Sequence, residues 1–301
     1  MITIAIDHGN RNIKTCHNVF SSGCKDYSER PIALVGDTIF YDGRYWALTS
    51  DPLSYKPDKT QSVDFFVLSL FAIAKELTEA KAKTDEEIKL AIGLPPQHIA
   101  KLGPTYKEYF KKGKISFRYN EKEFNINIVD CSIFPQGFAA AVSSIEYGSM
   151  IFKNSTTYIL DIGGITVDLL RFDNGQLVSD VIISHENGIS KMCANIKSKI
   201  YEATTLKYSI RDVEEILKGN KGASEQVMAI IKNTAEDWVK KIFDDIRQED
   251  VDLRTSPTIL LGGGAMLLKD FIEKNPFIGE RYYIDDIKAN AIGYLMLSKV
   301  S

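Results

Sequence analysis

Residues 160–170 read LDIGGITVDLL, and this stretch restricts the possible folds of the chain more than any other. An apolar run ends in Asp161, turns on two glycines and a threonine, and continues as a second apolar run that carries Asp168. A strand that only fills a core has no need of this pattern. A strand–turn–strand that holds a phosphate or a metal ion at its tip does need it, because glycine lets backbone N–H groups approach an anion with no Cβ in the way.

Two more glycine loops follow apolar runs. The loop at 7–14 reads DHGNRNIK, and the loop at 262–266 reads GGGAM. Asp7 and Asp161 stand at equivalent places, so they could share one hydrated Mg²⁺, which usually binds through one or two carboxylates plus phosphates. Lys14 adds a point charge for a β- or γ-phosphate. Each loop alone is more often an ordinary turn, but together the three favour a nucleotide clamped between two lobes.

The order of the expected elements repeats along the chain. Each half reads as a strand–turn–strand hairpin followed by further strands and helices, which predicts a duplicated α/β fold. The first half is expected to contain strands at 2–7, 12–19, 31–36 and 88–95, helices at 62–81 and from about 97 to 112, a hairpin at 114–130 and a small-residue helix after 135. The second half is expected to contain a hairpin at 156–172, strands at 176–185 and 257–261, and helices at 188–203, 223–246 and 289–300.

This order predicts two domains. Domain I spans 1–152, with a small insertion at about 36–61, and the final helix at 286–301 packs back on it. Domain II spans 153–285, with a short insertion at about 204–223. With 301 residues and 44 % hydrophobic composition the chain is large enough for two cores, since single cores stop growing at roughly 250–300 residues.

Composition and charge exclude several classes of function. The net charge is −3, so the basic excess that binds a phosphate backbone is missing, and we expect no direct nucleic-acid binding. The longest apolar run, FFVLSLFAIA at 65–74, is too short to span a bilayer and suits a buried helix. The chain shows no signal-peptide pattern and its four cysteines form no CxxC pair. We therefore expect a cytoplasmic protein with reduced thiols in its core and no membrane association.

Five motifs occur in the order of the actin-superfamily motifs phosphate 1, connect 1, phosphate 2, adenosine and connect 2. They read DHGNRNIK, FPQGFAAAV, DIGGITVD, LLGGGAM and ANAIGYLML, and they span nearly the whole chain. Within that superfamily the chain most resembles the bacterial and archaeal actin-like proteins of the ParM (StbA) plasmid-segregation type. The resemblance implies an actin-like α/β fold, ribonuclease-H-like and duplicated, with two lobes and a nucleotide in the central cleft.

The resemblance also implies roles for individual residues. The implied catalytic residues are Asp161, which holds Mg²⁺-bound water and orients the attacking water, Asp7, which joins it at the metal mainly through water, and Gln136, which lies near the attacking water. ParM resembles a glutamate version of this connect-1 position, so the glutamine is a departure. The implied nucleotide-binding residues are Gly9, Asn10, Asn12, Lys14, Gly163, Gly164, Thr166, Gly262, Gly263, Gly264, Ala265, Lys232 and Asn290.

Four positions in or near these motifs also have simpler explanations. His8 is better explained as a neutral spacer in the first loop than as an acid or base. Asp168 is either a second carboxylate near the metal or a hydrogen-bonding group within its own hairpin. Lys232 fits a solvated helix face, and Asn290 fits a helix N-cap.

The function that the resemblance implies is a filament-forming nucleotide hydrolase. Such a protein polymerises with ATP or GTP and Mg²⁺, hydrolyses the nucleotide slowly to time disassembly, and moves plasmid or phage DNA through a DNA-binding adaptor protein. The alternative is a small-molecule kinase of the same superfamily, which needs a base near its acceptor and a substrate pocket. A chaperone ATPase would need a peptide-binding domain for which the chain has no room, and a membrane-tethered relative would need an amphipathic basic terminus that the chain lacks.

Overall fold

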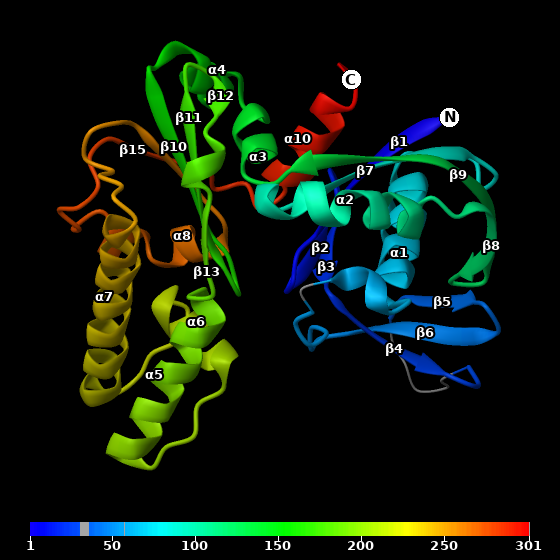
Figure 1. Ribbon diagram of the computed structural model, residues 1–301. Coiled ribbons are helices and arrows are strands. Elements are labelled where there is room, and N and C mark those ends of the chain that lie inside the picture. Colours follow the sequence, from blue (N-terminus) through cyan, green and yellow to red (C-terminus); the bar gives the residue numbers. More distant parts are fainter. Residues whose placement is uncertain (31–35, 57, 301) are drawn as a thin grey trace. The chain divides into compact units, whose positions relative to one another are not determined.

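The computed structural model describes residues 1–30, 36–56 and 58–300. The chain folds into two compact units, Met1–Ser144 with Lys288–Ser301 (unit 1) and Ile145–Ile287 (unit 2) (Figure 1). Each unit has its own sheet and its own hydrophobic core. The strand expected at 31–36 falls on residues 31–35, which lie outside the described residues.

Unit 1 is built on a mixed sheet. Its described strands follow the order β3-β2-β1-β7-β9-β8-β5-β6-β4, and β1, β7 and β9 run parallel at its centre. The strands are β1 (Ile2–His8), β2 (Asn12–Lys14), β3 (Val19–Ser21), β4 (Gly23–Tyr27), β5 (Thr38–Tyr41), β6 (Arg44–Thr49), β7 (Glu87–Leu94), β8 (Gly113–Tyr119) and β9 (Lys122–Pro135). The helices are η1 (Lys59–Gln61, a 3₁₀ turn), α1 (Asp64–Glu79), α2 (Pro96–Phe110), α3 (Phe138–Val142) and α10 (Ala289–Leu297).

Helix α1 is the buried centre of unit 1. Every residue from 65 to 74 is buried, as a helix that is apolar on all sides must be. This confirms the buried helix expected from the ten-residue apolar run. The helix begins at Asp64 and lacks a side-chain cap, because Val63 occupies the N-cap position. The Ser62 hydroxyl donates to the Asp64 carboxylate at 2.7 Å. No helix in the described residues is long and apolar enough to cross a membrane.

Helix α10 packs on unit 1 through small residues. Ala139 of α3 and Ala291 of α10 are both fully buried in one cluster. A Cβ added to Gly293 would lie 1.8 Å from the Ala139 carbonyl oxygen, so the two helices touch backbone to backbone at this point. The C-terminal helix therefore belongs to unit 1, which also explains why the sequence of α3 is rich in small residues.

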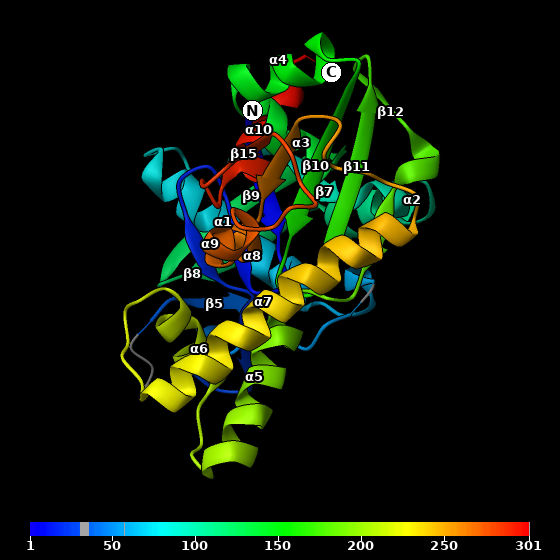
Figure 2. The ribbon, with the colours of Figure 1, turned by 90° about the vertical axis from the view of Figure 1, so that its left-hand side faces the viewer.

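Unit 2 contains a second sheet with the order β12-β11-β10-β14-β15, and β13 pairs with β11. Its strands are β10 (Thr156–Ile162), β11 (Val167–Asp173), β12 (Gln176–Leu177), β13 (Ile183–His185), β14 (Thr258–Leu261) and β15 (Arg281–Tyr283). Its helices are α4 (Ile145–Lys153), η2 (Ser179–Val181), α5 (Ile189–Thr204), α6 (Ile210–Leu217), α7 (Glu225–Gln248), α8 (Gly263–Leu267) and α9 (Lys269–Ile272). Figure 2 shows α7 as a long helix, and this helix packs against α5.

The division between the units differs from the one expected at residue 152. Helix α4 runs across that position and is attached to unit 2. The Thr157 hydroxyl donates to the Met150 carbonyl at 3.2 Å, and the Tyr147 hydroxyl donates to the Tyr283 carbonyl at 3.0 Å. The whole helix is therefore attached to unit 2, and the division between the units lies before it, at Ser144.

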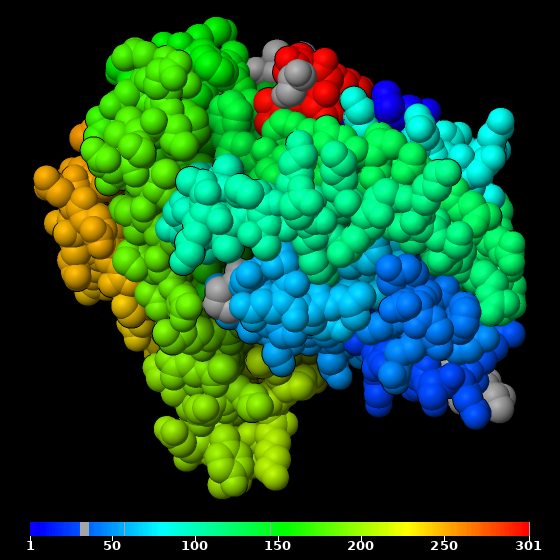
Figure 3. Space-filling model, turned by 45° about the vertical axis from the view of Figure 1, so that its right-hand side comes forward, coloured from blue at the N-terminus to red at the C-terminus, as the bar shows by residue number. Residues whose placement is uncertain are grey.

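Three expected elements also have a different form. The hairpin at β5 and β6 is not separate from the main sheet, because β5 pairs with β8. The strand expected at 12–19 ends at Lys14, where a turn separates β2 from β3, and the strand expected at 176–185 is broken into β12, η2 and β13. The segment between α5 and α6, within the insertion expected at 204–223, lies at the surface of unit 2 (Figure 3) and exposes Leu206.

Candidate functional site

The first candidate loop joins β1 to β2 in unit 1. The two strands pair in the register Asp7 opposite Lys14, so both side chains lie at the same end of the hairpin. The Lys14 amino group donates to one Asp7 oxygen at 2.8 Å, and the Gln136 amide donates to the other at 3.5 Å. The Asp7 side chain is 3 % exposed. Three residues that the sequence assigned to the site are therefore brought together around one buried carboxylate.

The turn itself requires a small residue. A Cβ added to Gly9 would lie 2.6 Å from the Asn12 carbonyl oxygen and 3.0 Å from the Lys14 amino group. Asn10 and Asn12 are partly exposed at this turn. The loop therefore presents backbone and amide groups close to a lysine, which suits the binding of an anion.

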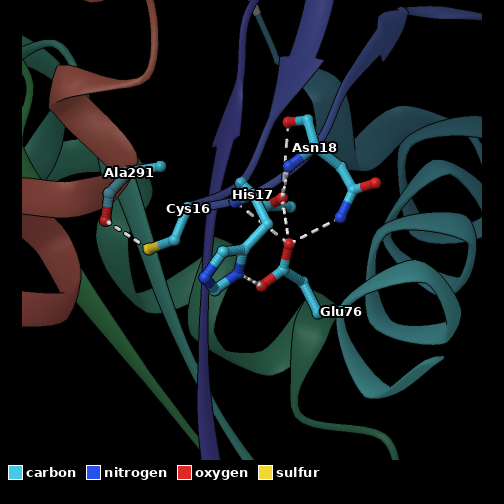
Figure 4. A network of polar contacts seen from close by, with 6 residues as sticks. Cys16, His17, Asn18, Glu76 and Ala291 are labelled. Atoms are coloured by element: carbon cyan, nitrogen blue, oxygen red, sulfur yellow. Dashed lines mark hydrogen bonds and ion pairs between the residues drawn. The ribbon is translucent and has the colours of Figure 1, made fainter. Parts of the chain in front are cut away.

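A hydrogen-bond network on Glu76 of α1 holds the turn between β2 and β3 (Figure 4). The Glu76 carboxylate accepts hydrogen bonds from the Thr15 hydroxyl, from the Asn18 amide at 2.8 Å and from the His17 backbone N–H at 3.3 Å, and it lies 2.7 Å from the His17 ring nitrogen. Burial works to raise the pKa of Glu76, but these hydrogen bonds outweigh it and hold the pKa below its usual value. The Cys16 thiol points the other way, to the Ala291 carbonyl of α10 at 3.9 Å. The strand that carries Lys14 is thus anchored on both sides.

Asn290 has a structural task in unit 1. Lys288 occupies the N-cap position of α10, so the explanation of Asn290 as an N-cap is wrong. Its side-chain oxygen instead accepts a hydrogen bond from the Gly137 backbone N–H at 3.1 Å. Gly137 has φ +76° and caps α3 immediately after Gln136. Asn290 therefore fixes the backbone that positions Gln136.

Two groups beside the first loop were not assigned by the sequence. The Lys59 amino group of η1 donates to the His8 carbonyl, and burial lowers the pKa of Lys59 to about 8, with Asp7 acting against this shift and Lys14 adding to it. Ser69 donates its hydroxyl to the Phe65 carbonyl at 2.9 Å, so the His8 ring nitrogen 2.7 Å away must be the donor to Ser69. Lys59 lies in a segment with no motif, so its position beside the first loop can be seen only in the structure.

His8 is a buried core residue. Its side chain packs against Phe110 with ring centroids 4.7 Å apart, and burial, followed by the charge of Lys59, lowers its pKa to about 3. A neutral imidazole with such a low pKa cannot serve as a base near neutral pH. The structure agrees with the explanation of His8 as a neutral spacer.

The second candidate loop joins β10 to β11 in unit 2. The strands pair with Asp161 opposite Asp168, and the Gly163 N–H donates to the Thr166 carbonyl at 2.8 Å to close the turn. The Thr166 hydroxyl donates to Asp168 at 2.8 Å. This bond supports the hydrogen-bonding explanation of Asp168 within its hairpin.

The third loop, between β14 and α8, lies against the second. Strand β14 runs parallel to β10 with Leu261 opposite Asp161. Gly262 has φ +90°, and a Cβ added to it would lie 2.3 Å from an Asp161 oxygen. Gly263 is exposed, whereas Gly264 and Ala265 are buried. The two glycine loops of unit 2 therefore meet at Asp161, and Gly262 and Gly263 are the glycines of the third loop that keep exposed surface.

The N-terminus of α5 supports the second loop. The Ile189 and Ser190 N–H groups donate to the carbonyls of the glycine turn, Gly163 at 3.1 Å and Gly164 at 2.9 Å. Gly188 precedes the helix, and a Cβ there would lie 2.5 Å from the backbone of the turn. This contact was not predicted from the sequence, where its only signal is a glycine before a helix. Lys232 lies on the exposed side of α7, and none of its described contacts links it to these loops.

The described residues contain no group of three or more His, Cys, Asp or Glu side chains that could hold a metal ion. Such a group is not required for Mg²⁺, which binds through one or two carboxylates and keeps several waters. Both Asp7 oxygens already accept hydrogen bonds, whereas Asp161 is partly exposed. Each carboxylate by itself offers oxygen ligands of the kind that a hydrated Mg²⁺ accepts. The four cysteines are reduced, and Cys24, Cys131 and Cys193 are buried.

Two family models match the chain. Residues 5–138 match the N-terminal domain of actin like proteins, and residues 159–274 match the C-terminal domain of the archaeal actin homologue MreB-like family. The first match covers the loop at Asp7 and Lys14, and the second covers the loops at Asp161 and Gly262. A search of the curated proteins found no match.

Solved structures show the same fold. The chain is similar to Ta0583, an archaeal actin homologue, in complex with ADP (21 % identity, TM-score 0.78, 100 % of both chains covered). It is also similar to ParM in a 15-stranded filament from Clostridium botulinum (18 % identity, TM-score 0.77, 99 % of both chains) and to apo pSK41 ParM (16 % identity, TM-score 0.75, 99 % of this chain and 97 % of that one). At such low sequence identities the structural similarity establishes the fold alone, and that fold is actin-like. With both halves matched in turn by actin-like families, the chain belongs to the actin superfamily, among its archaeal and bacterial actin-like proteins.

Proposed function

We propose that the chain is a filament-forming protein that polymerises with ATP or GTP and hydrolyses the nucleotide slowly to time disassembly. The observation that carries this proposal is the pair of aspartate–glycine loops, one in each unit, with the aspartate fixed at a strand end in both. The ADP complex of Ta0583 and the ParM filament from Clostridium botulinum support it. Chains of this fold thus include one that binds a nucleotide and one that assembles.

The residues divide into those that hold phosphates and those that act on water. Lys14 and the backbone N–H groups around Gly9 would bind the phosphates, and the turn at Gly163 would do the same from unit 2. Asp161 would orient the attacking water, with Gln136 beside it. Mg²⁺, held mainly through water by Asp7 and Asp161, would neutralise phosphate charge.

The chemistry of these loops favours slow hydrolysis. Their polar side chains are carboxylates, amides, the Thr166 hydroxyl and the cationic groups of Arg11 and Lys14, and the imidazole of His8 is neutral and bonded to Ser69. Phosphoryl transfer to water would therefore rest on positioning and on charge neutralisation. Such a site is better suited to timing the life of a polymer than to metabolic turnover. Nothing in the described residues favours the small-molecule kinase.

The partners follow from charge and fold. With a net charge of −3 the chain is poorly suited to bind DNA itself, so a DNA-binding adaptor protein would connect the filament to a plasmid or phage genome. The main partner is a second copy of the chain, repeated along a cytoplasmic filament.

Pelleting and negative-stain microscopy of the pure chain test this proposal. The chain is incubated with Mg²⁺ and ATP, GTP or ADP, and calorimetry measures binding in the same buffers. We expect filaments with a triphosphate and few or none with ADP, and the two triphosphates show which base is preferred. Nucleotide binding without filaments would refute assembly alone, whereas the absence of any binding would refute the whole proposal.

A further inference from the structure

Lys59 lies against the first loop without belonging to any motif. Its amino group donates to the His8 carbonyl, one residue after Asp7. Its backbone N–H donates to the Tyr106 hydroxyl at 3.2 Å, and its amino group lies 5.0 Å from the centre of the Phe65 ring. Helix α2, helix α1 and the loop therefore all hold this lysine in one place.

The charge of Lys59 lacks a close counter-charge. Lys14 pairs with Asp7 at 2.8 Å, but among the described residues no carboxylate lies within ion-pair distance of Lys59. Its neighbour Asp58 caps η1 through the Thr60 backbone and hydroxyl. Lys59 therefore places a second lysine beside Asp7, next to a loop that already carries Arg11 and Lys14.

An unbalanced, partly buried cation is unfavourable unless an anion comes near it. The His8 ring is neutral and cannot supply a charge. Asp7 and Lys14 both act on the pKa of Lys59, Asp7 raising it and Lys14 lowering it. A polyphosphate bound at this loop would supply the missing negative charge.

We propose that Lys59 is a second phosphate-binding lysine, which adds its charge to that of Lys14 at the phosphate chain of the bound nucleotide. This inference rests on the proposed function. It assigns a nucleotide-binding task to η1, in the segment that leads into α1. It also explains why the amino group is directed toward the loop backbone instead of into water, where a lysine side chain is ordinarily placed.

Three substitutions separate the charge of Lys59 from its hydrogen bond. Lys59→Met removes both, and Lys59→Gln removes the charge but keeps a donor for the His8 carbonyl. Lys56→Met is the matched control, because the Lys56 side chain is partly exposed and its amino group lies 3.8 Å from the Asp64 carboxylate. Calorimetry with Mg²⁺ and ATP or GTP measures binding, and thermal unfolding with and without nucleotide measures folding.

We expect Lys59→Met and Lys59→Gln each to weaken triphosphate binding by ~10–100-fold, the range for a charge-assisted hydrogen bond. Lys56→Met should bind like the wild type. Without nucleotide, Lys59→Met should unfold at or above the wild-type temperature, because it removes an unbalanced charge, while the rise in Tm on adding nucleotide shrinks.

Two results would overturn the inference and leave the proposed function intact. In one, the wild type binds nucleotide and Lys59→Gln binds equally well, so that only the hydrogen bond matters. In the other, Lys59→Met lowers the Tm without nucleotide but keeps the full rise on binding, which is the behaviour of a structural residue. A wild type that binds no nucleotide would instead refute the proposed function, and the inference with it.

Discussion

Gly262→Ala is expected to damage folding and chemistry together. Gly262 has φ +90° and ψ 155°, a backbone conformation that essentially only glycine adopts. The added methyl group would lie 2.3 Å from an Asp161 oxygen and 2.6 Å from the Ile162 carbonyl oxygen. Both distances are far inside van der Waals contact, so Asp161 or the backbone has to move.

The magnitude follows from these two effects. A non-glycine residue in such a conformation costs about 1–3 kcal/mol, and forcing a methyl group into a packed site costs about 1–3 kcal/mol more. Gly262→Ala should therefore lower the free energy of unfolding by ~2–6 kcal/mol. Since Asp161 is displaced, nucleotide hydrolysis should also fall by ~100-fold, the effect of misplacing a catalytic group by about 1 Å.

The neighbouring glycine provides the control. Gly263 has no atom within 4 Å of an added Cβ and is the first residue of α8. Gly263→Ala should be neutral or stabilising by about 0.4–1 kcal/mol. Urea unfolding and a phosphate-release assay measure both variants. If Gly262→Ala proves as stable as Gly263→Ala and as active as the wild type, the packing of the third loop on Asp161 is wrong.

Three further predictions test other parts of the structure. Lys14→Ala should weaken triphosphate binding more than diphosphate binding, by about 1–3 kcal/mol, as measured by calorimetry, because the charge acts mainly at the distal phosphates. Glu76→Gln should lower stability at neutral pH by about 1–3 kcal/mol through weaker hydrogen bonds. The folded-state pKa of Glu76 is depressed, so its stabilisation is fully present above the unfolded pKa of about 4.3 and is lost as the pH falls through the folded value. In urea unfolding, the free energies of unfolding of Glu76→Gln and the wild type should therefore converge in acid. Gly293→Ala should destabilise unit 1 by about 1–3 kcal/mol in thermal or urea unfolding, since its methyl would overlap the Ala139 backbone, whereas the helical control Gly103→Ala should not.

Each of these has a contradicting result. Equal losses for tri- and diphosphate would place Lys14 away from the distal phosphates. A constant difference between Glu76→Gln and the wild type at all pH values would show that the carboxylate does not titrate with folding. Equal stability of Gly293→Ala and Gly103→Ala would mean that α10 does not pack closely on α3.

The sequence was most informative where local pattern and chemistry coincide. Apolar strands that end in Asp7 and Asp161 before glycine turns predicted both loops, and the structure shows the two hairpins. The fold class could be predicted because these patterns repeat in order along the chain. The packing of Gly262 against Asp161 is a contact that only the structure shows.

The contacts that the sequence did not reveal join segments far apart in the chain. Lys59 and His8 are 51 positions apart, and nothing in the local pattern around Lys59 marks it as a neighbour of a loop. Asn290 and Gly137 are 153 positions apart, so the asparagine looked like a helix cap. The division between the units lies at Ser144 and not at the expected residue 152 for a similar reason. The side-chain contacts that attach α4 to unit 2 leave no signal in the periodicity of that helix.

The central claim is that nucleotide hydrolysis at Asp161 limits the life of a polymer. Light scattering and pelleting after a limiting pulse of ATP or GTP with Mg²⁺ test it, with wild type and Asp161→Ala compared side by side. With the wild type, the light scattering should rise as polymer forms and then decay. The variant should bind nucleotide, and its light scattering should rise and stay high, because hydrolysis falls by at least ~100-fold on loss of a positioned catalytic group. A variant that decays as fast as the wild type would contradict the account, and so would a wild type that forms no polymer with either triphosphate.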